Sequence, residues 1–139
     1  MTTPFVDADV IIRLISGDDP VKRKAAAVLF EQVEHGTLQL ATPVTTVADC
    51  LYVLCSPRLY NFSRPEAVSR LLALVRLPNF RLGQRRTVIR ALEIYAVANI
   101  DFGDAMIAAS MVESGANVVY SYDAHFDRLP GITRKPPSR

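Results

Sequence analysis

The chain has 139 residues, half of them hydrophobic, and a formal net charge of +2 at pH 7. This length and apolar content suit one compact domain with its own core and exclude a generally disordered chain. The sequence has no apolar stretch long enough to cross a bilayer, and its first residues do not resemble a signal peptide, so we expect a cytoplasmic protein with no membrane partner. The small positive charge permits a nucleic-acid partner without requiring one.

Hydrophobic periodicity and helix caps predict six elements in the first part of the chain. Phe5-Val6 is a short apolar run that stops at Asp7, as in a strand, and Gly17 ends the helix that follows. Pro20 and Ser63 are typical of helix starts. The expected elements are a strand at 5–6, helices at 8–16 and 20–36, a strand at 38–41, a helix at 43–55 with Thr42 as its cap, and a helix at 65–77.

The remaining residues continue the alternation of strands and helices. The expected elements are a strand at 80–82, a helix at 87–98, a helix from 103 or 104 to 114, and a buried strand at 117–122. This order indicates the α/β class, with a parallel β-sheet flanked by helices. We expect one domain over residues 1–133 and a loose, basic tail over residues 134–139.

The cysteines do not predict a disulfide or a structural zinc site. Cys50 and Cys55 lie five residues apart on one expected helix, which is too far for a disulfide. The two cysteines and two histidines show none of the paired spacing of zinc sites.

Four aspartates lie at positions that favour an active-site or metal-binding role in an α/β fold. Asp7 and Asp123 each follow an expected strand, and active sites gather at the carboxyl ends of parallel strands. Asp49 and Asp104 lie inside or at the start of apolar helices, where a carboxylate is expected to be buried or half-buried. Neither has a Lys or Arg three or four residues further on. Clustered carboxylates without cations repel one another, and Mg²⁺ or Mn²⁺ would relieve that repulsion.

A simpler interpretation makes these aspartates helix caps and loop residues. Asp104 would cap the helix after Gly103, and Asp123 would cap a short turn before Phe126. The occurrence of all four in one small α/β domain favours the functional interpretation.

Four motifs, in order along nearly the whole chain, resemble those of PIN domains. They are residues 5–12, 47–54, 101–109 and 121–126, and residues 17–20 resemble a loop of VapC-like toxins from type II toxin–antitoxin modules. Two positions depart from the family pattern. The second acid is usually Glu and here is Asp49, and the position two after the first Asp is often Asn and here is Asp9.

This resemblance implies a metal-dependent endoribonuclease that cleaves RNA with Mg²⁺ or Mn²⁺. It implies that Asp7 and Asp104 are direct metal ligands and that Asp49 and Asp123 complete the acidic, catalytic pocket, through metal-bound water. Ser121 is expected to steady the cluster by hydrogen bonding. Toxins of this kind are homodimers that a cognate antitoxin blocks, with an Arg or Lys taking the place of the metal's charge.

Several other polar residues have weaker assignments. Asp9 is a secondary ligand candidate, Asp101 and Asp127 are expected to be surface or capping residues, and His125 is expected to be a loop residue rather than a catalytic base. Basic residues that could line an RNA-binding rim, or simply form solvated helix faces, are Arg81, Arg85, Arg86, Arg90, Arg134, Lys135 and Arg139. The expected dimer surface includes the apolar residues of helices 43–55 and 65–77, which could equally pack on the sheet.

Two alternatives remain open at the level of sequence. Asp7-Ala8-Asp9 also resembles the paired aspartates of haloacid-dehalogenase-type phosphatases, but the three lysines, Lys22, Lys24 and Lys135, stand in segments expected to be exposed or terminal. The second alternative is a catalytically inactive PIN-like module that binds RNA or protein, and the presence of all four acidic positions argues against it.

Overall fold

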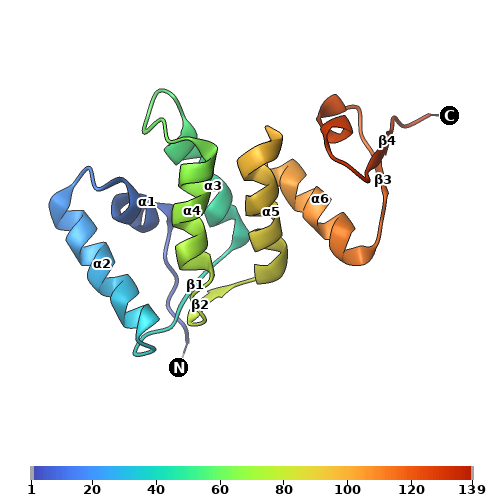
Figure 1. Cartoon of the computed structure of the whole chain (residues 1–139). Helices are drawn as coiled ribbons and strands as arrows, with labels where there is room; N and C mark the ends of the chain where they lie inside the picture. Colours follow the sequence, from blue (N-terminus) through green and yellow to red (C-terminus); the bar gives the residue numbers. More distant parts are fainter. Residues whose placement is uncertain (1, 139) are drawn as a thin grey trace. The chain divides into compact units, whose positions relative to one another are not determined.

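The computed structural model describes residues 2–138, and its internal contacts divide the chain into two units, residues 1–85 and residues 86–139 (Figure 1). The elements of the first unit are α1 (Ala8–Ser16), α2 (Pro20–Glu34), β1 (Leu40–Thr42), α3 (Val44–Cys55), α4 (Arg64–Val75) and β2 (Phe80–Leu82). Those that follow are α5 (Arg85–Ala98), α6 (Phe102–Ser114), β3 (Val118–Tyr120), the 3-10 helix η1 (Ala124–Arg128) and β4 (Thr133–Lys135). The predicted α/β class is confirmed.

Two short parallel strands and the N-terminal segment form the sheet of the first unit. Leu40 in β1 pairs with Phe80 in β2, and both are buried. The strand predicted at residues 5–6 is a single parallel bridge, Phe5 to Ala41, in which the Val6 N–H donates to the Ala41 carbonyl at 3.0 Å. This bridge brings the backbone that precedes Asp7 alongside β1.

Helices α1 and α2 pack side by side in the first unit (Figure 1). Both begin as the sequence predicts, since Asp7 caps α1 and Asp19 caps α2 ahead of Pro20. Gly17 ends α1 in the left-handed conformation, at φ 67°, which a glycine adopts without strain. The side chains that these helices bury are Ile11, Ile12, Ile15, Ala26, Phe30 and Val33.

The prediction that Thr42 caps α3 is wrong. Thr42 belongs to β1, and Pro43 stands at the cap position without a side-chain hydrogen bond. The buried Thr42 hydroxyl donates to the Val6 carbonyl at 2.8 Å and lies 2.7 Å from the Thr46 hydroxyl. Thr42 therefore ties the segment before Asp7 to the first turn of α3.

The strand predicted at residues 117–122 is shorter than expected and is not buried. β3 pairs in parallel with β4, and the Val118 side chain is 39% exposed. The β-branched run at this position identified a strand correctly, but the prediction that this strand is buried is wrong.

The prediction of a loose tail from residue 134 is wrong for its first two residues. Arg134 and Lys135 lie in β4, and the Arg134 guanidinium pairs with both carboxylate oxygens of Asp127, at 3.1 and 3.2 Å. The same guanidinium donates to the Ser121 carbonyl at 3.2 Å. A charge-assisted pair therefore fastens β4 to η1 and to the end of β3.

Neither cysteine forms a disulfide, as predicted. No helix in residues 2–138 combines the length and the apolar character needed to span a membrane.

A polar cluster around Asp18 holds the connection between α1 and α2 in place. The Asp18 carboxylate accepts hydrogen bonds from the Tyr60 hydroxyl at 2.7 Å, the Ser16 hydroxyl at 2.8 Å and Arg13 at 3.1 Å. The Tyr60 bond is the largest cause that lowers the pKa of Asp18 to about 2. Tyr60 lies between α3 and α4, so the cluster joins two loops that are far apart in the sequence.

This cluster predicts a pH dependence of stability. A carboxyl pKa that is lowered in the folded state stabilises the fold above the unfolded value of 3.8, and the contribution is lost as pH falls toward 2. Asp18→Asn should therefore be less stable than wild type at pH 6, by a small amount because Asp18 is exposed, and the difference should shrink by pH 3. Urea unfolding at both pH values measures this, and a difference that grows on acidification would contradict it.

Candidate metal centre

Three side chains of the second unit form a cluster that could hold a metal ion. Asp104, Asp123 and His125 each offer one ligand atom, and these atoms all lie within 4.8 Å of one another. Among residues 2–138 this is the one such group of three or more acidic, histidine or cysteine side chains. It includes two of the four predicted site residues and adds His125, which the sequence analysis assigned to a loop.

Local hydrogen bonding explains why Asp104 is available as a ligand. Asp101, not Asp104, caps α6, because its side chain accepts from the Asp104 N–H at 2.8 Å. The predicted capping role of Asp101 is thus confirmed, and the alternative in which Asp104 caps the helix is wrong. Asp104 stands in the first turn of α6, half-buried, with its carboxylate free of the capping role.

Asp123 and His125 are positioned by the turn that follows β3. The Ser121 hydroxyl accepts from the Asp123 N–H at 2.9 Å, which is the steadying role expected for Ser121. The Asp123 carboxylate caps η1 by accepting from the His125 N–H at 2.8 Å. The same carboxylate oxygen lies 3.2 Å from the Nδ1 atom of the imidazole ring.

The electrostatics of the cluster favour a bound cation. Burial raises the pKa of Asp104, the negative charges of Asp101 and Asp123 raise it further, and His125 acts in the opposite direction. The expectation that Asp104 is a half-buried carboxylate is therefore confirmed. A divalent ion bound next to Asp104 would compensate the negative charges of this carboxylate and its neighbours.

Asp7 and Asp49 lie in the first unit, at the start of α1 and on α3, and Cys50 on α3 is buried. The Cys50 Sγ atom is 4.0 Å from the Ala8 carbonyl oxygen, which places α3 against the start of α1. Burial raises the pKa of Cys50 to about 12, and the charges of Asp49 and Asp7 add to that increase. The charges of both carboxylates therefore act on the same buried thiol.

One expectation for the first unit needs correction, the burial of Asp49. Asp49 was expected to be buried or half-buried, but it is exposed on α3, because the apolar side chains of that helix point to the core on its other faces. Asp7 also has a structural role, since its carboxylate caps α1 by accepting from the Val10 N–H at 3.3 Å. Asp9, the secondary candidate, forms an ion pair with Arg13 at 3.4 Å.

The basic residues differ in how freely they could contact RNA. Arg81, Arg86 and Arg90 are exposed. Arg85 is half-buried and donates to the carbonyl oxygens of Pro78 and Phe80, so it holds the turn after β2. Arg134 is engaged by Asp127.

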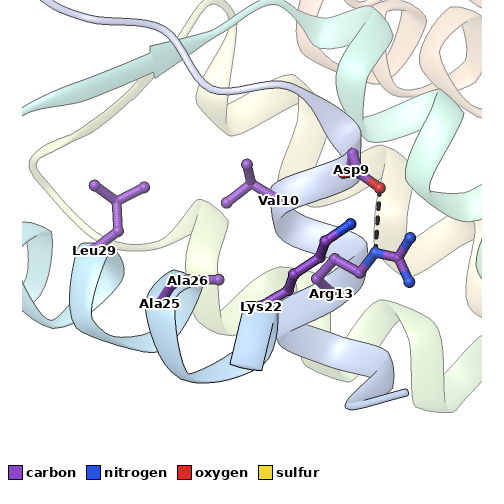
Figure 2. A pocket seen from close by; sticks show the side chains of 7 residues that line it. All are labelled: Asp9, Val10, Arg13, Lys22, Ala25, Ala26 and Leu29. Atoms are coloured by element: carbon purple, nitrogen blue, oxygen red, sulfur yellow. Dashed lines mark ion pairs between the residues drawn. The ribbon is translucent and has the colours of Figure 1, made fainter. Parts of the chain in front are cut away.

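A groove of about 300 Å³ between α1 and α2 is separate from the acidic cluster (Figure 2). Figure 2 shows its apolar floor and the ion pair between Asp9 and Arg13 at its edge. The residues that line it are Asp9, Val10, Arg13, Lys22, Ala25, Ala26 and Leu29. None of the four predicted site aspartates lines it.

Comparison with known proteins identifies the family. The model of the PIN domain family matches residues 5–132, so the chain belongs to the PIN domain family. A search of curated proteins found no match. PIN domains are generally Mg²⁺- or Mn²⁺-dependent nucleases, and family membership therefore suggests a metal-dependent nuclease.

The donor set of the second unit fits a divalent metal. Two carboxylates supply the oxygen ligands that Mg²⁺ and Mn²⁺ prefer, and they lie close enough to share one ion. The signal for Asp104 and Asp123 was present in the sequence motifs. No sequence signal distinguished His125, because its place in the donor group depends on the turn that holds its imidazole ring beside the Asp123 carboxylate.

Proposed function

We propose that this protein is a metal-dependent endoribonuclease that hydrolyses RNA phosphodiester bonds and is the toxin component of a toxin–antitoxin pair. The observation that carries the proposal is the half-buried Asp104 carboxylate beside Asp123, with its raised pKa, in a chain of the PIN domain family. The toxin role rests on the resemblance of residues 17–20 to a loop of VapC-like toxins, beside four acidic motifs that resemble those of PIN domains.

The four aspartates have two different roles in this proposal. Asp104 and Asp7 bind the metal directly, and Asp49 and Asp123 complete the acidic pocket. The inclusion of Asp7 and Asp49 is supported by their sequence motifs and by the packing of α3, which carries Asp49, against the start of α1, which Asp7 caps. A bound divalent ion supplies a water of lowered pKa and neutralises charge on the phosphate.

The proposed RNA contacts come from exposed arginines, because an acidic pocket repels RNA unless cations surround it. The candidates are Arg81, Arg86 and Arg90, because each is exposed. None of the three forms an ion pair with another residue in the range 2–138.

The homodimer and the antitoxin remain proposals that rest on the family resemblance. The apolar stripe of α4 lends the dimer less support than expected, because Val68, Leu71 and Val75 are buried. Tyr52 on α3 is 77% exposed and is available to a partner. A cytoplasmic location likewise stays a prediction.

The experiment that tests the proposed function compares matched single-stranded RNA and DNA as substrates. We expect internal cleavage of RNA in Mg²⁺ or Mn²⁺, little cleavage of DNA, and complete inhibition by EDTA. Cleavage that persists in EDTA, or the absence of RNA cleavage with either metal on a panel of structured and unstructured RNAs, would contradict it. A phosphoenzyme trapped on Asp7 would favour the phosphatase instead.

A further inference from the structure

We infer that His125 supplies an imidazole nitrogen to the metal centre and thereby increases its preference for first-row transition-metal ions over Mg²⁺. The inference rests on the proposed function only in that it concerns the same metal centre. It adds a ligand of a different chemical kind to the four carboxylates that the sequence motifs indicate.

The turn after β3 places the imidazole ring beside the carboxylate of Asp123. The Asp123 Oδ1 atom accepts from the backbone N–H of His125 at 2.8 Å and lies 3.2 Å from its Nδ1 atom. These two contacts with one oxygen fix the ring beside the carboxylate. The side chains of His125 and Asp123 are 47% and 43% exposed, so an ion can reach them from solvent.

The separation of the donor atoms is close to that required by one ion. The ligand atoms of Asp104, Asp123 and His125 all lie within 4.8 Å of one another. Opposite ligands of an octahedral ion with bonds of about 2.1 Å are about 4.2 Å apart, so small side-chain rotations suffice.

An imidazole ligand changes which metals the centre prefers. Mg²⁺ binds oxygen ligands and retains water, whereas imidazole nitrogen binds strongly to Co²⁺, Ni²⁺ and Zn²⁺. A centre of carboxylates and one imidazole therefore binds transition-metal ions more tightly than carboxylates alone, with little gain for Mg²⁺. The other histidine, His35, follows α2 and belongs to no donor group within the described part of the chain.

The test observes the nitrogen ligand directly by pulsed EPR of the Mn²⁺-loaded protein. We expect the hyperfine coupling of a directly bound imidazole ¹⁴N, its replacement by a ¹⁵N coupling when only histidine is ¹⁵N-labelled, and its retention in the control variant His35→Ala. Calorimetry gives the second readout, with Ni²⁺ affinity falling about ten-fold or more in His125→Ala and Mg²⁺ affinity nearly unchanged.

Each outcome decides the inference independently of RNA cleavage. If Mn²⁺ binds and the labelled wild-type protein shows no histidine nitrogen coupling, His125 only orients Asp123 and the inference is overturned, even where the RNA assay supports the nuclease. A histidine coupling in a protein that cleaves no RNA would support the inference and overturn the proposed function. The labelled wild-type measurement remains decisive if His125→Ala fails to fold.

Discussion

Asp104→Asn and Asp7→Asn should each reduce metal-dependent RNA cleavage by at least about a thousand-fold, because an amide is a weak metal ligand and carries no charge. Both variants should fold. Asn is as good a helix cap as Asp, so Asp7→Asn keeps the cap of α1, and α6 keeps its cap from Asp101. Cleavage rates with saturating Mn²⁺, together with circular dichroism, measure both halves of the prediction.

A matched control separates the loss of a ligand from the loss of a negative charge. Glu93→Gln removes a carboxylate from an exposed position on α5 and should cleave RNA at the wild-type rate. Cleavage within a few-fold of wild type in both aspartate variants would show that neither carboxylate binds the catalytic metal.

Metal binding should stabilise the wild-type protein strongly, and Asp104→Asn should remove most of that response. A ligand that binds only the folded state at one hundred times its Kd raises the free energy of unfolding by about 2.7 kcal/mol. Asp104→Asn should melt at a higher temperature than wild type in EDTA, because the amide removes a charge whose burial, together with repulsion from Asp101 and Asp123, raises the pKa of Asp104. Thermal unfolding with Mn²⁺ and with EDTA measures both effects.

The two conditions together distinguish a metal ligand from a structural residue. Asp101→Asn is the control, since Asn preserves the cap of α6 and Asp101 is not one of the donor group. This control should keep its response to Mn²⁺. A lower melting temperature of Asp104→Asn in EDTA would instead make Asp104 a structural residue of the α6 terminus.

The sequence by itself determined the helices α1 to α6 and the approximate positions of β1 to β3, because their signals are local, whereas β4 and the 3-10 helix η1 were not predicted. Apolar periodicity, the end signal at Gly17 and the start signals at Pro20 and Ser63 place α1, α2 and α4 within a few residues of where they lie. The acidic motifs were equally local, since each is a short run of residues around one aspartate, and the family match supports the resemblance they indicated.

The tertiary structure decided which polar groups meet and which side chains are covered. Burial depends on what packs against a strand or helix, so sequence patterns alone predicted the wrong burial for Asp49 and for β3. The turn at the start of η1 places His125 beside Asp123 and so adds it to the donor group. The strand β4 shows that regular structure continues to Lys135. These contacts join residues whose side chains give no local signal of their partners, and so only the folded chain could reveal them.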